Sequence, residues 1–127
     1  MEEIISKYSP LALAFIGDAH YNLLVKRKAI DRKVKSNDLQ QFAAVYCSAR
    51  TQALISSYLL DNQILDETEL MIFKKGRKAK SHNAPKNTDA VTYRISTGFE
   101  ALWGYWYLSG QQQRLEQIWD IIETIEV

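Results

Sequence analysis

The sequence is short of the residues that break or cross-link a chain. Among 127 residues there are two prolines, five glycines and one cysteine, and 46% of the residues are hydrophobic. This composition favours a compact helical domain over a disordered chain. Cys47 cannot form an internal disulfide, and its apolar neighbours predict a buried, inert thiol. We therefore expect a protein of the reducing cytoplasm.

Long hydrophobic runs and a large net charge are missing as well. The apolar run 11–16 is soon followed by Asp18 and His20, well short of a membrane span, and acidic residues rather than a basic leader precede it. We expect neither a membrane helix nor a signal peptide. The net charge of +1 excludes a general polyanion binder. The length predicts one domain, spanning 1–127.

Helical periodicity runs through most of the chain, and no alternating strand pattern of useful length occurs. Ser9 followed by Pro10 predicts the start of a long helix that reaches about Lys28. Asp66 and Glu69 have the spacing of a capping box. Further helices are predicted from a cap at Ser36 or Asn37, over 49–60, from Asn87 or Thr88 to Leu108, and over 115–125. The predicted fold class is all-α.

Two isolated carboxylates stand in otherwise apolar helices. Asp18 shares a helical face with Leu11 and Phe15, which the spacing assigns to packed core, and Glu100 is the only charge in 98–108. A buried carboxylate costs several kcal/mol unless a cation or a donor compensates it. If the two helices are neighbours, the carboxylates can share a divalent cation. Oxygen ligands without histidine or cysteine suit Mg²⁺ or Mn²⁺.

The same pattern has a plainer interpretation. A single acid on an apolar helix face can be an edge residue, half of an intramolecular salt bridge, or an oligomer contact, because perturbed acids also occur outside functional sites. Gly17, Gly98 and Gly104 lie inside predicted helices, where each costs about 1 kcal/mol relative to alanine. Close approach between helix backbones would explain these glycines. Pattern alone leaves both interpretations open.

A basic segment without any acidic residue lies between the two carboxylates, and most of it falls in a predicted loop over 77–87. Side chains of this kind suit contacts to the phosphates and sugars of RNA. The candidate RNA-binding residues are Lys74, Lys75, Arg77, Lys78, Lys80, Ser81, Lys86 and Asn87. A second basic segment, 26–35, is interpreted as a solvated face.

We assign no catalytic role to the histidines and no base-stacking role to the large aromatic residues. His20 and His82 are each isolated, and lone histidines are more often structural or exposed than catalytic. The spacing of four aromatic side chains is that of a helical core rather than of a base-stacking surface. These are Trp103, Trp106, Tyr107 and Trp119.

Two segments far apart in the chain resemble a known family. Residues 15–19, Phe-Ile-Gly-Asp-Ala, and 97–104, Thr-Gly-Phe-Glu-Ala-Leu-Trp-Gly, resemble in order the two catalytic motifs of the ribonuclease III family. Between them, 75–81 and 85–89 resemble Mini-III, the short bacterial subfamily without a double-stranded-RNA-binding domain. The resemblance covers nearly the whole chain, and its specificity comes from the order and separation of the two motifs.

The resemblance implies an all-α, homodimeric, Mg²⁺-dependent endoribonuclease that cuts double-stranded RNA and leaves 5′-phosphate and 3′-hydroxyl ends. Asp18 and Glu100 match its catalytic metal ligands, and Mn²⁺ is expected to substitute for Mg²⁺. Other members carry further carboxylates where this chain has Leu11, Ala14 and Thr97, so fewer protein ligands and more water are implied. The subfamily matures the ends of 23S ribosomal RNA, helped by a large-subunit ribosomal protein on the precursor.

Two other functions stay open at this point. A non-catalytic member of the same fold could bind RNA in ribosome assembly, an alternative favoured by the absence of acids at Ala14 and Thr97. A helical interaction module could instead bind an acidic protein through its basic loop. Cleavage of duplex RNA separates the enzyme from the first alternative, and salt-sensitive RNA affinity separates it from the second.

Overall fold

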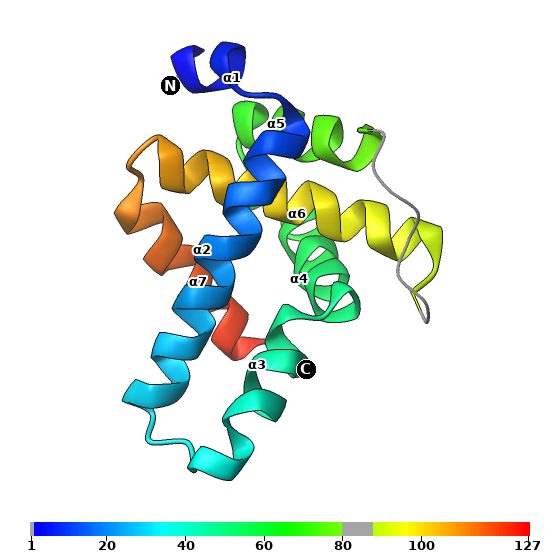
Figure 1. The fold of residues 1–127 in the computed structure, drawn as a ribbon. Coiled ribbons are helices and arrows are strands. Elements are labelled where there is room, and N and C mark those ends of the chain that lie inside the picture. The colour runs from blue at the N-terminus through cyan, green and yellow to red at the C-terminus, as the bar shows by residue number, and fades with distance from the viewer. Residues whose placement is uncertain (1, 80–87) are drawn as a thin grey trace.

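The computed structural model describes residues 2–79 and 88–127, and the regular elements of this part are all helical. The all-α prediction is confirmed. Figure 1 shows α2 crossing α6, with the N-terminus at the top of the molecule and the C-terminus beside α3. The elements in order are α1 (Glu2–Lys7), α2 (Pro10–Asp31), the 3-10 helix η1 (Ser36–Asp38), α3 (Leu39–Cys47), α4 (Ala49–Asp61), α5 (Glu67–Lys78), α6 (Ala90–Leu108) and α7 (Gln112–Thr124).

Two of the helix starts are those that the sequence predicts. The Ser9 side chain accepts a hydrogen bond of 3.1 Å from the backbone N–H of Ala12 and so caps α2. The capping box of α5 forms in both directions. The Asp66 carboxylate accepts from the backbone N–H of Glu69 at 2.8 Å, and the Glu69 carboxylate accepts from the backbone N–H of Asp66 at 2.9 Å.

Other helix ends differ from the prediction. The α6 helix is capped by Asp89 rather than by Asn87 or Thr88, because the Asp89 carboxylate accepts from the backbone N–H of Thr92 at 2.8 Å. At the end of α5 the helix continues through Arg77 to Lys78, where a loop was predicted. Basic side chains in a last helical turn are favoured by the helix dipole, which explains the longer helix. Within the described residues, no helix is long and apolar enough to span a membrane.

The central helix is α6, which contacts α2, α4, α5 and α7. Trp103, Trp106 and Trp119 are fully buried, as predicted. Tyr107 is not part of the core, because 44% of its surface is exposed and its ring stacks on His20 with 4.4 Å between centroids. The periodicity could not distinguish these cases, since Tyr107 lies one residue beyond the buried stretch of α6.

Glycines set how closely the helices approach α6. A Cβ atom on Gly17 of α2 would overlap the carbonyl oxygen of Glu100, and a Cβ atom on Gly104 would overlap the carbonyl oxygen of Leu13. On the other side of α6, a Cβ atom on Gly98 would come within 2.8 Å of the carbonyl oxygen of Phe73 in α5. The expectation of close backbone approach is confirmed at Gly17, Gly98 and Gly104.

A buried ionic cluster, which includes neither Asp18 nor Glu100, joins α5, α6 and α7. The carboxylate of Glu69 accepts from the indole Nε1 of Trp106 at 2.6 Å and from the guanidinium of Arg114 at 2.7 and 2.8 Å. Burial acts to raise the pKa of Glu69, but the hydrogen bonds from Arg114, the Asp66 backbone and Trp106 outweigh it and lower the pKa. Glu69 is therefore an acid whose charge is fully compensated.

Gly17→Ala is expected to lower the free energy of unfolding by at least about 3 kcal/mol, because its Cβ would strike backbone that cannot move aside. The loss should appear although alanine has about 1 kcal/mol better helix propensity. Urea denaturation measures it.

Gly110→Ala is the matched control for this prediction. Gly110 has φ of 70° and open space around its Cβ position, so that only the backbone conformation is strained and the cost should be about 1–2 kcal/mol. Equal losses in the two variants would contradict the role of helix contact.

Candidate active site

The contact between α2 and α6 brings the two sequence-predicted carboxylates together. Gly17 packs against the Glu100 backbone, and Asp18 is the next residue of α2. The Asp18 and Glu100 side chains approach within hydrogen-bonding distance. Asp18 is exposed and Glu100 is half-buried. The pair therefore lies at the surface, on residues that are 82 positions apart in the chain (100 − 18).

The two carboxyl groups cannot both ionise without cost. Burial, followed by the hydrogen bond and the negative charge of Asp18, raises the pKa of Glu100 from 4.5 to about 9, while Gln52 acts in the opposite direction. At neutral pH the pair therefore retains a proton when no cation is present. A bound cation would replace this proton and compensate both charges.

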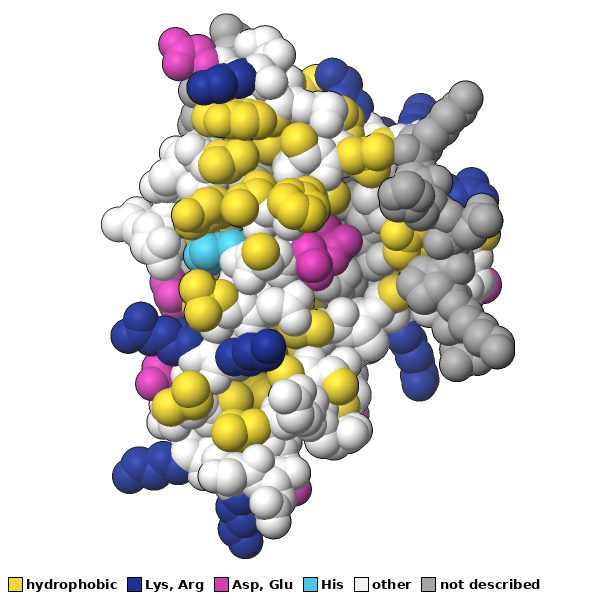
Figure 2. Space-filling view, viewed as in Figure 1, with side chains coloured by type: hydrophobic (Ala, Val, Ile, Leu, Met, Phe, Trp, Pro, Cys, Tyr) yellow, Lys and Arg dark blue, Asp and Glu magenta, His cyan; other side chains and the backbone are white. Residues whose placement is uncertain are grey.

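Asp18 borders an exposed apolar face of α2. The hydrophobic side chains of this face were wrongly assigned to the packed core from the sequence. Leu11 and Phe15 were assigned to packed core, but 38% and 81% of their surfaces are exposed. The opposite face of α2 supplies the core. We call the exposed hydrophobic side chains of α2 the apolar stripe, which Figure 2 shows along the helix with acidic side chains beside it. Its members are Leu11, Phe15, Leu23 and Ile30.

Two amide side chains that sequence reasoning gave no role stand next to the carboxylates. Nδ2 of Asn22 donates to Oδ1 of Asp18 at 3.0 Å and to the Asp18 carbonyl oxygen at 2.8 Å. Gln52 of α4 is buried and faces Glu100. The available signal for Gln52 was a large polar residue at helical spacing from Ile55 and Leu59, the buried face of α4.

Cys47 and His20 complete the surroundings without taking part in the chemistry. Burial raises the pKa of the half-buried Cys47 thiol to about 11, with Asp18 and Glu100 raising it further and Lys26 opposing them, so the thiol stays protonated. For His20, burial lowers the pKa, and Nδ1 accepts a hydrogen bond of 2.9 Å from the indole of Trp103. His20 is thus a structural histidine, and His82 lies outside the described residues.

The described members of the candidate RNA-binding set lie on the last turns of α5. Lys74, Lys75 and Lys78 are exposed, and the guanidinium of Arg77 lies 5.6 Å from the centre of the Phe73 ring. This end of α5 is held close to α6 because Gly76 packs against Gly98 and its neighbours, two residues before Glu100. The other candidate RNA-binding residues lie outside the described residues, namely Lys80, Ser81, Lys86 and Asn87.

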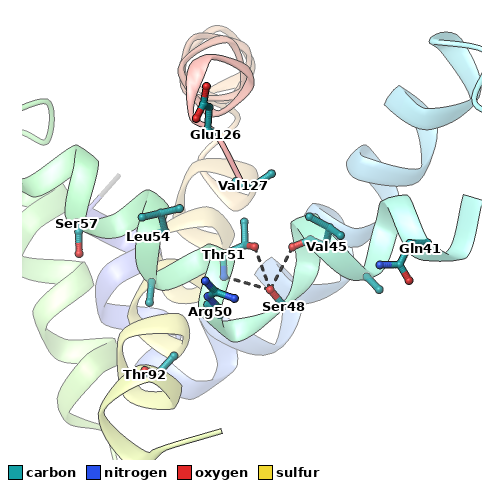
Figure 3. Close-up of a pocket in the computed structure, with 12 residues that line it drawn as sticks. Gln41, Val45, Ser48, Arg50, Thr51, Leu54, Ser57, Thr92, Glu126 and Val127 are labelled. Carbon is teal, nitrogen blue, oxygen red and sulfur yellow. Dashed lines mark hydrogen bonds between the residues drawn. The ribbon is translucent and has the colours of Figure 1, made fainter. Parts of the chain in front are cut away.

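A separate groove of about 610 Å³ lies where α3, α4, the start of α6 and the carboxyl end of the chain meet (Figure 3). Its polar wall includes Ser48, whose hydroxyl accepts from the backbone N–H of Thr51 at 3.1 Å and caps α4. Neither Asp18 nor Glu100 lines this groove. The groove is therefore separate from the carboxylate pair.

The donor set at the carboxylate pair suits a hard divalent cation. Both protein donors are carboxylate oxygens, and their mutual repulsion favours a cation between them. In the described part of the chain, no third histidine, cysteine, aspartate or glutamate joins the pair as a possible ligand. A cation would therefore complete its coordination with water and substrate oxygens, as Mg²⁺ commonly does.

The structure is thus an all-helical domain in which two crossing helices each present one carboxylate, and comparisons with known proteins show its family. Residues 11–111 match the family described as Ribonuclease III domain. The chain is 45% identical to Mini-ribonuclease 3 of Streptococcus pneumoniae over 85% of each chain, and 40% identical to Mini-ribonuclease 3 of Staphylococcus aureus over 95% of this chain and 91% of that one.

A solved structure supports the fold. A crystal structure of a Fusobacterium nucleatum protein, 26% identical, superposes with a TM-score of 0.84 and covers 93% of this chain and 95% of that one. The chain belongs to the ribonuclease III family. It is an endoribonuclease of the ribonuclease III type.

Glu100→Gln is expected to stabilise the metal-free protein at neutral pH, because it removes a carboxyl group that folding desolvates beside Asp18. The pKa of Glu100 is raised in the folded state, so the wild-type protein keeps its full stability below about pH 4.5 and loses stability as the pH rises towards 9. Urea denaturation in EDTA across this range measures the difference.

The control for this pH profile is Glu126→Gln, which removes an exposed carboxylate near the chain end. Its profile should run parallel to that of the wild-type protein. A Glu100→Gln profile that also runs parallel to the wild type would contradict the coupling between the two carboxyl groups.

Proposed function

We propose that Asp18 and Glu100 together hold Mg²⁺, which Mn²⁺ can replace, and that the protein uses this site to hydrolyse phosphodiester bonds of double-stranded RNA. The observation that carries the proposal is the meeting of two oxygen donors at the surface of a ribonuclease III-type domain, where Asp18 helps to raise the pKa of Glu100. The relatives named Mini-ribonuclease 3 support the same chemistry.

When bound, the cation would supply Lewis-acid chemistry, namely neutralisation of charge on the scissile phosphate and activation of water. The residues of the chain have a positioning task. Asn22 fixes the Asp18 carboxylate through its Nδ2 hydrogen bond. The glycine contact fixes the backbone of Glu100 relative to α2, so that both carboxylates face the same point on the surface.

Duplex RNA fits the surroundings of this site better than a small molecule. A-form RNA is recognised by its shape, phosphates and 2′-hydroxyl groups, which an exposed site flanked by lysines can contact. Lys74, Lys75 and Lys78 on α5 would bind phosphates and add salt dependence to the affinity. Arg77 and the predicted contacts of Lys80, Ser81, Lys86 and Asn87 belong to the same proposed RNA-binding surface.

We also propose that the protein works as a homodimer, with the apolar stripe of α2 as the interface. One carboxylate pair cuts one strand, so that cutting both strands in one encounter needs two chains related by a two-fold axis. Exposed hydrophobic side chains that follow one helix are typical of an interface. Because Asp18 lies on the same helix, dimerisation would place two sites at fixed separation.

The proposed cellular role is maturation of 23S ribosomal RNA ends in the cytoplasm, on a precursor carrying a large-subunit ribosomal protein. It rests on the likeness to Mini-III, and the single half-buried cysteine fits a reducing compartment. The second candidate is an RNA-binding ribosome-assembly protein with weak catalysis. Its support is that only two acids meet at the site in the described residues.

Glu100→Gln is expected to lower the rate of duplex cleavage in Mg²⁺ by at least about a thousandfold, while the affinity for duplex RNA in Ca²⁺ or EDTA changes less than threefold. The reason is that an amide cannot replace a charged oxygen ligand, whereas RNA affinity comes mainly from phosphate contacts elsewhere. Gel-resolved cleavage and fluorescence anisotropy measure the two quantities.

Glu116→Gln serves as the control, because Glu116 pairs with Lys28 at 3.3 Å on the surface and lies away from the carboxylate pair in the sequence and in its contacts. It should cleave at the wild-type rate. Normal cleavage by Glu100→Gln would refute the proposed site, and binding without cleavage by the wild-type protein would establish the second candidate.

Phe15→Arg is expected to convert the dimer to a monomer. A two-fold interface would bury two copies of this side chain, worth roughly 1.5–3 kcal/mol each, so the dimer dissociation constant should rise by about a hundredfold or more. The fold should persist because Phe15 is 81% exposed. Sedimentation velocity measures the oligomeric state, with Val91→Arg as the control at another exposed hydrophobic residue, on α6 and outside the stripe. A Phe15→Arg protein that sediments as the wild type would exclude this interface.

A further inference from the structure

Gln52 is an unusual residue of the core. Only 1% of its surface is exposed, yet its amide Nε2 has no hydrogen-bond partner among the described residues. A buried donor without a partner costs about 1–3 kcal/mol. Its helix, α4, packs against α6, the helix that carries Glu100. Because burying this side chain is unfavourable, its presence in the core needs an explanation other than packing.

The other buried polar side chains of α4 have partners. The Ser56 hydroxyl donates to the backbone carbonyl of Gln52 at 2.8 Å, and the Thr51 hydroxyl is 3.0 Å from that of Ser48. Each of these groups is satisfied within the helix or its cap. The unused donor of α4 is therefore specific to Gln52 and to the direction in which it points.

That direction is towards Glu100. The Gln52 amide is near enough to lower the pKa of Glu100, although it does not complete a well-aligned hydrogen bond to the carboxyl group. In the metal-free protein, the Asp18 side chain also lies within hydrogen-bonding reach of Glu100 and raises its pKa. An ionised Glu100 has free lone pairs on both oxygens, and a charged acceptor forms the stronger hydrogen bond with an amide.

We infer that Gln52 is a positioning residue for the metal-bound state, in which its Nε2 donates to one carboxylate oxygen of Glu100 and leaves the other oxygen for the divalent cation. This inference rests on the proposed function of Glu100 as a metal ligand. Side chains that orient a metal ligand contribute to affinity although they do not touch the ion. Gln52 would do so from a helix that is not part of either sequence motif.

The test measures Mn²⁺ binding to the wild-type protein, Gln52→Leu and Glu100→Gln by isothermal titration with MnCl₂, without RNA. Gln52→Leu should bind Mn²⁺ at least about tenfold more weakly, in the range known for residues that orient ligands. It should be no less stable to urea without metal, because leucine has no donor to leave unsatisfied. In duplex cleavage its kcat should fall while KM for RNA stays within twofold.

Ser56→Ala is the matched control, since it removes a buried hydroxyl group one turn further along α4 that bonds only to backbone. It should bind Mn²⁺ like the wild type. If Gln52→Leu does not fold, Gln52→Met takes its place. The wild-type protein also gives a direct readout by NMR, because one Nε2 proton of Gln52 should move downfield when MgCl₂ is added.

The outcomes distinguish a failure of this inference from a failure of the proposed function. Wild-type Mn²⁺ affinity in Gln52→Leu together with loss of binding in Glu100→Gln would overturn the role of Gln52 and leave the metal site in place. Unchanged binding in Glu100→Gln would overturn both. A Gln52 amide proton that does not respond to MgCl₂ would likewise overturn the inference, whatever the variants do.

Discussion

The contact between the backbones of α2 and α6 is the constraint on which the site depends. Gly17 and Gly104 let each helix rest against carbonyl groups of the other. Asp18 follows Gly17, and Glu100 supplies the carbonyl that Gly17 meets, so the same contact that packs the core sets the separation of the two carboxyl groups. A larger residue at either glycine would move the carboxylates apart as well as weaken the fold.

Placing Asp18 and Glu100 together is unfavourable in the metal-free protein. A second acid, Glu69, shows how the protein compensates a buried charge. Glu69, a fully buried acid in the described part of the core, is neutralised by Arg114 and stabilises the junction of α5, α6 and α7. For the half-buried Glu100, no cationic side chain among the described residues lowers the pKa in this way. Under the proposed function, this contrast separates a structural charge, which the protein compensates internally, from a functional charge, which a bound cation would compensate.

Local signals in the sequence predicted two of the helix starts and the burial of the three tryptophans. Ser9 and the Asp66–Glu69 box specify their helices through hydrogen bonds that involve only neighbouring residues, which is why they could be read from the chain. The exposure of Phe15 could not, because periodicity identifies an apolar face without saying whether it meets the same chain or another surface. The sequence could not predict a role for Gln52 for a related reason. Its proposed role depends on contact with Glu100, which is 48 residues away (100 − 52) and comes close to it only in the folded chain.

The three faces of α2 connect folding with the proposed catalysis. One face holds Gly17, Tyr21 and Val25 against the core, and a second carries the exposed hydrophobic side chains. Asp18 lies between them with Asn22 one turn further on. Because a helix is rigid over this length, the orientation of Asp18 is fixed by the core on one side and would be fixed relative to a second chain on the other. If the proposed metal site and homodimer are correct, core packing, ligand geometry and the spacing of two cleavage sites on a duplex would all follow from the placement of a single helix.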